Sequence, residues 1–203
     1  MSAHLFLEID QHLLEDEKPS VYLQKQLDHG VLDTPPYTIL AAMAKTEQNP
    51  KYHPEGDVFT HTLLVVDEAA KHRGESSDPR AFMWAALLHD VGKPETTKWR
   101  KGKITAYNHD IAGAEKARHF LESLTDEKAF IDRVVSLVRF HMQPFLTSIG
   151  RAQAALDKLA TESDYRELAR LSLCDRLGRL DVDEAAERHM IERFITQMQT
   201  RQD

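Results

Sequence analysis

The segment that most constrains the fold is a helix predicted between Asp78 and Gly92, whose interior AFMWAALL is apolar on almost every side. Asp78 followed by Pro79 is typical of a helix start, and Gly92-Lys93-Pro94 of a helix end. A helix that is apolar all round is normally buried on all sides. We therefore expect this helix at the centre of a bundle.

The rest of the chain is also rich in helix signals, and it lacks β-α-β alternation or a fixed-period repeat. Thr34-Pro35-Pro36 is interpreted as a helix start, Gly30 as a C-terminal cap and Pro144 as a stop. Further helices are predicted over about 3–15, 20–29, 34–44, 57–73, 110–123, 126–142, 151–159, 163–177 and 183–200.

One stretch departs from the helical pattern. TTKWRKGKITAYN carries β-branched and aromatic residues on both sides of Lys101-Gly102, which predicts a short hairpin. The predicted fold class is all-α, a helical bundle with one short β-hairpin near 97–107.

Composition excludes several classes of protein. The 203 residues include 26 Lys and Arg against 33 Asp and Glu, a net charge of −7, which argues against non-specific DNA binding. No apolar run approaches the roughly 18–20 residues of a membrane-spanning helix, and the N-terminus does not resemble a signal peptide. A single Cys excludes a disulfide framework and a cysteine-rich zinc ribbon. We expect a cytoplasmic protein without a membrane partner.

His89 and Asp90 close the apolar helix, where a lone carboxylate would be costly. Burying an unpaired charge costs several kcal/mol, so a positive partner must lie beside Asp90. Lys93 is one candidate and a metal ion is the other.

Four more potential ligands lie at or near predicted helix ends: His61, His109, His141 and Asp175. Neighbours along this series are separated by about one helix plus a connection. Different helices of one bundle can therefore each deliver a ligand to a shared centre. A His at a helix end is more often a cap or a surface group, and a buried Asp is often an N-cap or an ion-pair partner, so spacing alone leaves both interpretations open.

The order His61, His89-Asp90, Asp175 resembles the HD superfamily of metal-dependent phosphohydrolases. The blocks KYHPEGDVFTHTLL, AALLHDVGKP, YNHDIAGAE, VRFH and LCDRLGR are similar to the HD domain attached to bacterial CCA-adding tRNA nucleotidyltransferases and related polynucleotide adenylyltransferases. The resemblance covers residues 51–179. A second His-Asp pair, His109-Asp110, follows the first, and we interpret His109 as the ligand there.

The catalytic head of a nucleotidyltransferase is missing from the resemblance. Nothing before Lys51 has its Gly-rich turn and paired-aspartate strand, and the DVD at 181–183 lacks both. We therefore expect a free-standing HD domain over residues 51–203, a single compact unit, with residues 1–50 as an N-terminal helical extension packed on it.

The resemblance implies a ligand set and a reaction. His61, His89, Asp90 and Asp175 would hold one metal, and Asp90 could bridge to a second held by His109 and His141. Such mixed ligation suits Mn, Ni, Co, Fe or Zn. Because a bound ion can lower the pKa of water to about 7, we expect hydrolysis of a nucleotide phosphomonoester or a 2′,3′-cyclic phosphodiester.

Cations beside these ligands are candidates for substrate binding. The resemblance implies that Lys93 holds the substrate phosphate, and a salt bridge to Asp90 is its alternative role. Arg176 and Arg179 follow Asp175, and each could bind phosphate or form an ion pair. For the HPEGD block, residues 53–57, hydrogen bonding and N-capping are as plausible as catalysis.

Lys98, Arg100, Lys101 and Lys103 surround Trp99 in the predicted hairpin. They could contact RNA phosphate while Trp99 stacks on a base, although a solvated tip is the commoner role. Two alternative functions follow: an RNA- or tRNA-binding module with a structural metal, and a dNTP or alarmone hydrolase. The leading prediction has a nucleotide or a short RNA end as substrate, Asp90 and Lys93 as catalytic residues, and Cys174 in the core.

Overall fold

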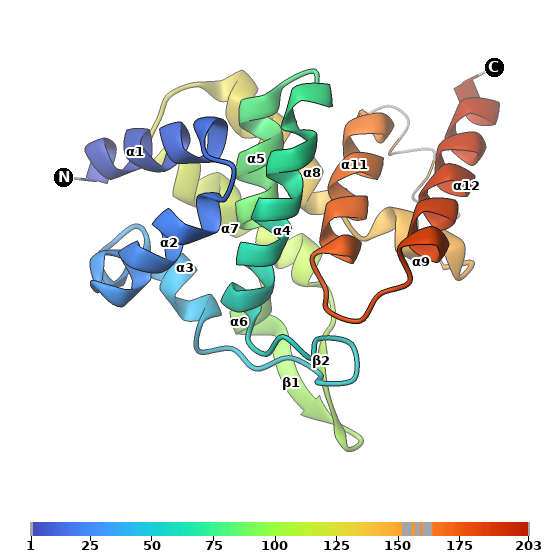
Figure 1. Cartoon of the computed structure of the whole chain (residues 1–203), viewed down its shortest axis with the longest axis horizontal. Coiled ribbons are helices and arrows are strands. Elements are labelled where there is room, and N and C mark those ends of the chain that lie inside the picture. Colours follow the sequence, from blue (N-terminus) through green and yellow to red (C-terminus); the bar gives the residue numbers. More distant parts are fainter. Residues whose placement is uncertain (1, 152–155, 157–158, 160–163, 203) are drawn as a thin grey trace.

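The chain folds into a helical bundle with one small hairpin at its edge. The computed structural model describes residues 2–151, 156, 159 and 164–202 (Figure 1). Its helices, 3-10 turns (η) and strands are α1 Ser2–Glu15, α2 Pro19–Asp28, η1 Val31–Asp33, α3 Thr38–Met43, α4 Val58–His72, η2 Arg73–Glu75, α5 Pro79–Leu88, α6 Lys93–Thr96, β1 Thr97–Arg100, β2 Lys103–Ala106, α7 His109–Glu122, α8 Lys128–Phe140, α9 Gln143–Ser148, α11 Tyr165–Leu177 and α12 Glu184–Gln202.

Helix α5 is the centre of the core, as its sequence predicts. Asp78 caps it by accepting a hydrogen bond from the Ala81 amide at 3.1 Å. Every residue from Ala81 to Leu88 is buried. Figure 1 shows α5 in the middle of the bundle, between the N-terminal helices and the pair α11 and α12, and α4, α8, α11 and α1 all pack against it. Its C-terminal end is therefore surrounded by protein.

The N-terminal helices share this core. Phe6 of α1 stacks on Trp84 of α5 with ring centroids 4.9 Å apart, and Trp84 donates a hydrogen bond from Nε1 to Asp10 at 2.7 Å. The Arg73 guanidinium donates to the Leu13 carbonyl at 3.1 Å near the end of α1. The division at residue 50 stays a prediction, but apolar residues on both sides of it belong to one continuous core.

The hairpin forms where β-propensity predicts it. Strands β1 and β2 are antiparallel, with Thr97 opposite Ala106 and Arg100 opposite Lys103. Between them, Lys101 and Gly102 have φ angles of +48° and +76°. A two-residue turn with positive φ at both positions suits the right-handed twist of the strands.

Two helix predictions around prolines are wrong. The helix expected at 34–44 begins only at Thr38, because a residue before proline is pushed towards extended backbone and Thr34 has φ −102° and ψ 137°. Pro144 does not end the helix predicted before it, since α8 already ends at Phe140. It stands in the first turn of α9, where its missing N–H costs nothing.

The prediction at 151–159 falls mostly outside the described residues. Among the residues that the structure describes, no helix is long and apolar enough to cross a membrane.

Candidate metal centre

Five helices bring the predicted ligands together at the C-terminal end of α5. The Asp57 side chain caps α4 by accepting from the amides of Phe59 and Thr60 at 2.8 and 2.9 Å, which places His61 on the first turns of that helix. The other ligands come from the ends of α5 and α8, from the start of α7 and from α11. All six side chains are buried: His61, His89, Asp90, His109, His141 and Asp175.

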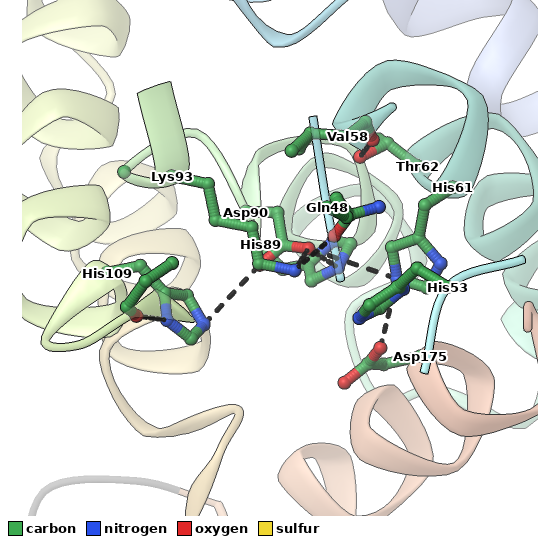
Figure 2. Close-up of polar contacts among 12 residues, drawn as sticks. Gln48, His53, Val58, His61, Thr62, His89, Asp90, Lys93, His109 and Asp175 are labelled. Carbon is green, nitrogen blue, oxygen red and sulfur yellow. Dashed lines mark hydrogen bonds and ion pairs between the residues drawn. The ribbon is translucent and has the colours of Figure 1, made fainter. Parts of the chain in front are cut away.

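Asp90 lies between His109 on one side and His61 on the other, close to His89 (Figure 2). Its Oδ2 atom is 3.2 Å from Nε2 of His89 and 3.9 Å from Nε2 of His61. Its Oδ1 atom is 3.4 Å from Nε2 of His109 and 3.9 Å from Nε2 of His141. Each oxygen of the Asp90 carboxylate thus faces its own pair of imidazoles. Asp90 with either pair forms a group of three side chains compact enough to hold a metal ion.

Backbone carbonyls set the proton positions on three of these rings. His89, His109 and His141 each donate from Nδ1 to the carbonyl of the residue three positions before, at 2.8, 2.7 and 2.7 Å. A neutral imidazole with a proton on Nδ1 carries a lone pair on Nε2. When the rings are neutral, the three Nε2 lone pairs therefore point into the site. Burial alone would lower the pKa of His89, but the charge of Asp90 raises it, so a metal ion competes with a proton at this ring.

The donor set fits a divalent metal. Nε2 atoms of His109 and His141 lie only 3.2 Å apart, so their lone pairs repel unless a cation lies between them. Two nitrogens bound tetrahedrally to one zinc ion at 2.0–2.1 Å would be separated by about 3.3 Å, close to this spacing. Burial lowers the pKa of His141 to about 4 and also lowers that of His109, which keeps the rings in the neutral form that binds metals.

Asp175 completes the arrangement on the other side. Its Oδ1 is 3.1 Å from Nε2 of His61 and 3.2 Å from the Arg179 guanidinium. Burial alone would raise the pKa of Asp175, but the charge of Arg179 and the contact with His61 hold it well below the usual value. Asp175 is consequently an ionised carboxylate at neutral pH.

Glu55 belongs to the HPEGD block, for which the sequence left hydrogen bonding, N-capping and catalysis equally plausible, and the structure places it behind His61. Its side chain is 1 % exposed, and its Oε1 lies 2.9 Å from Nδ1 of both His61 and His53. Burial alone would raise the pKa of Glu55, but its hydrogen bonds with His53 and His61 keep it below the ordinary value. A carboxylate behind a metal-binding imidazole fixes the ring and makes it a stronger donor. The available signal was the HPEGD block, which is equally typical of a capped loop.

Lys93 makes the salt bridge that was its alternative role. Its Nζ is 2.6 Å from Asp90 Oδ2 and donates to Gln48 at 2.7 Å. Burial alone would raise the pKa of Asp90, whereas the Lys93 charge and then His89 hold it well below the usual value. Gln48 gave no signal in the sequence, because it belongs to a polar loop far from Lys93 along the chain.

A cavity of about 430 Å³ opens over the ligands. The predicted substrate-binding cations Lys93, Arg176 and Arg179 all line it. The Arg176 guanidinium is also held by Glu187, at 2.8 and 2.5 Å. The hairpin supplies one wall, through Thr97, Ile104, Thr105 and Ala106.

Gly92 permits the close approach that brings His109 to Asp90. A Cβ atom at Gly92 would lie 2.1 Å from the His109 carbonyl oxygen and 2.5 Å from the Gly113 amide nitrogen. Only a residue without a side chain lets the turn after α5 touch the start of α7.

The HD-domain family model matches residues 58–180. The chain belongs to the HD-domain family. The match spans α4 to the end of α11, the part of the chain that carries all six predicted ligands. HD domains bind divalent metals, and the family is generally one of metal-dependent hydrolases.

The HD domain also matches longer curated proteins named "Multifunctional CCA protein". The one from Pasteurella multocida is 30 % identical over 188 residues, covering 88 % of this chain and 43 % of its own length. The one from Halorhodospira halophila is 39 % identical over 101 residues, 50 % of this chain and 23 % of that protein. The chain therefore spans less than half the length of these relatives.

Proposed function

We propose that this HD domain is a metal-dependent phosphohydrolase that acts on nucleotide phosphomonoesters or 2′,3′-cyclic phosphodiesters. The observation that carries the proposal is Asp90, whose two oxygens face two separate groups of imidazole nitrogens beneath an open, cation-lined cavity. Membership of the HD family supports the hydrolase class. The nucleotide substrate is a further proposal that family membership does not supply.

In this proposal the ligands divide into two sets that share Asp90. His61, His89, Asp90 and Asp175 hold one ion, and Asp90, His109 and His141 hold a second. Mn, Ni, Co, Fe and Zn fit this mixture of imidazole and carboxylate donors. When bound, a divalent ion supplies a Lewis acid for phosphoryl oxygens and lowers the pKa of water.

Lys93 and Arg179 position the substrate phosphate. Each is paired with a site carboxylate, Lys93 with Asp90 and Arg179 with Asp175, so each is held at the cavity floor. Once metal ions compensate those carboxylates, the two cations can turn their donors to phosphate oxygens. Arg176, anchored by Glu187, adds positive potential to the wall rather than a movable donor.

The test combines metal content with turnover. The protein purified with Mn, Co, Ni, Fe or Zn is assayed on nucleoside monophosphates, 2′,3′-cyclic nucleotides, dNTPs and a generic phosphatase substrate. We expect metal-dependent release of phosphate or ring opening. The chain offers a matched pair of variants, because both Asp90 and Asp110 follow a histidine, but Asp110 pairs with Arg139 at 2.6 Å.

Asp90→Asn should abolish turnover and metal retention, whereas Asp110→Asn should keep both. Absence of turnover with every metal, or an Asp90→Asn variant as active as the parent, would contradict the proposal. Turnover of dNTPs alone would instead favour the dNTP hydrolase alternative.

The single Cys174 is buried and free, in keeping with a reducing compartment, and we propose a cytoplasmic location.

An RNA-binding module with a structural metal is a second candidate because the hairpin is exposed and basic. It predicts RNA binding without turnover of any of these substrates. Charge reversal at Lys98, Arg100 and Lys101 should then abolish the binding. Under the leading proposal the same variant retains hydrolysis of mononucleotides.

A further inference from the structure

One face of the hairpin continues the cavity wall outwards. Residues directly opposite in an antiparallel pair point to the same face, so Thr97 with Ala106 and Trp99 with Ile104 share one face. Thr97, Ala106 and Ile104 line the cavity, as does Thr105, whose register position puts it on the other face. Trp99 is the next residue outwards on the face of Ile104, with 72 % of its surface exposed.

The separation of these side chains suits two neighbouring nucleotides. Opposed side chains of an antiparallel pair have Cβ atoms about 4.5–5.5 Å apart. The Trp99 side chain therefore lies directly beside Ile104, at the outer edge of the cavity wall. If one nucleotide of a single-stranded nucleic acid is bound in the cavity, the base of the adjacent nucleotide is within reach of the indole ring.

The other face of the hairpin is strongly positive. Residues 97–106 contain four cations and no acidic residue, in a chain with a net charge of −7. Arg100 lies directly opposite Lys103, and like charges in that position destabilise a strand pair. Within the described part of the chain these four cations have no acidic partner within ion-pair distance, whereas Lys116 pairs with Glu95 and Arg139 pairs with Asp110.

An anionic ligand would remove this repulsion. Arg100 lies over the Tyr107 ring, with its Cζ 5.1 Å from the ring centroid, so its guanidinium group stays close to the end of β2. The phosphates of a single-stranded nucleic acid that extends from the cavity over the hairpin would neutralise these cations. Trp99 on one face of the hairpin, with cations on the other face and at the turn, supplies both an aromatic surface and positive charge, the two elements with which proteins bind single-stranded nucleic acid.

We propose that the hairpin is a second subsite, in which Trp99 stacks on the base next to the nucleotide in the cavity while the hairpin cations contact the strand's phosphates. This inference rests on the proposed function and deepens it. The preferred substrate is then the end of a single-stranded nucleic acid, not a free nucleotide.

The kinetic test compares two substrates that share a reacting end. A nucleoside 2′,3′-cyclic monophosphate and a trinucleotide ending in the same cyclic phosphate are assayed with the metal-loaded protein. We expect a higher kcat/KM for the trinucleotide. Trp99→Ala should lower the ratio of the two kcat/KM values by roughly 5- to 150-fold, the range that loss of base stacking gives.

Two further variants separate stacking from a general disturbance. Trp99→Phe keeps an aromatic face and should retain most of the preference. Leu7→Ala removes an exposed apolar side chain from α1 and should leave both kcat/KM values unchanged.

Binding has its own readout, independent of turnover. The chain has two tryptophans, and Trp84 is fully buried, so a trinucleotide with a 3′-hydroxyl end should quench only the fluorescence of Trp99. Lys101→Asn removes a charge at a position with φ +48°, which Asn adopts readily. It should weaken this binding and reduce its salt dependence by about 0.7 in log–log slope for each phosphate that the protein no longer neutralises.

Two outcomes overturn the inference in different ways. Hydrolysis of the mononucleotide with no preference for the trinucleotide and no quenching refutes the subsite and leaves the proposed function standing. Absence of turnover for both substrates refutes the proposed function. Quenching of Trp99 would then leave the hairpin as a binding surface only, and its absence would refute the subsite as well.

Discussion

Replacing Glu55 with Gln tests whether that carboxylate tunes the metal centre through His61. The substitution keeps the shape of a side chain that is 1 % exposed and removes its charge. One oxygen can keep its 2.9 Å approach to Nδ1 of His61. The other becomes an amide NH₂, at a place where Glu55 Oε2 has no hydrogen-bond partner.

The expected effect has two parts. Loss of the charge behind His61 weakens the imidazole as a donor, and partners of this kind are typically worth 10- to 100-fold in metal affinity, or about 1.4–2.7 kcal/mol. The buried amide left without an acceptor costs the metal-free protein about 1–3 kcal/mol of unfolding free energy. His61 keeps its place on α4, so the fold persists.

Calorimetric titration of the metal-free protein with Zn or Co measures the change in metal affinity. Urea unfolding measures the change in the free energy of unfolding. The control is Glu95→Gln, which removes an exposed carboxylate paired with Lys116 at 2.6 Å, outside the cavity lining. It should change the metal affinity by less than about twofold, since an exposed surface ion pair contributes little. If Glu55→Gln binds metal as tightly as the parent, Glu55 does not act through His61 and this account of its role is wrong.

Four other outcomes are expected. Asp175→Asn and His141→Asn should each lower the bound metal from two ions to one, measured by native mass spectrometry. Removing metal with a chelator should lower the melting temperature by roughly 5–11 °C if the protein was loaded at 100 times its Kd, measured by calorimetry. Gly92→Ala should shift the start of α7 by about 1 Å, because its Cβ would lie 2.1 Å from the His109 carbonyl, and should lower kcat/KM about 100-fold while helical circular dichroism persists. The Cys174 thiol should not react with Ellman's reagent until the protein unfolds, because it is fully buried and burial raises its pKa.

Local patterns predicted most of the elements in this protein. The apolar run of α5 placed it at the centre, Asp57 and Asp78 cap the helices that follow them, and Lys101-Gly102 forms the hairpin turn. These features depend on residues close together in the chain, so their physics is visible in the sequence. The error at 34–44 is of the same local kind, since two consecutive prolines disfavour helix in the residues before them.

The sequence also indicated that histidines and aspartates at helix ends converge, and the structure brings all six of these side chains together. How they converge was decided by tertiary packing. Asp90 turns one oxygen to each histidine group only because α4, α7 and α8 meet at the end of α5, and Gly92 allows the close approach of α7.

The partners behind the ligands come from tertiary structure alone. Glu55 on His61 and Gln48 on Lys93 belong to the loop before α4, which carries no periodic pattern and lies on the site because the bundle folds it there. The same holds for Trp99. Its exposure in a hairpin is local, but its position beside the cavity exists only once the hairpin packs against the helices. Backbone preferences act between neighbours in sequence, whereas a binding site depends on contacts between segments that only the packed core brings together.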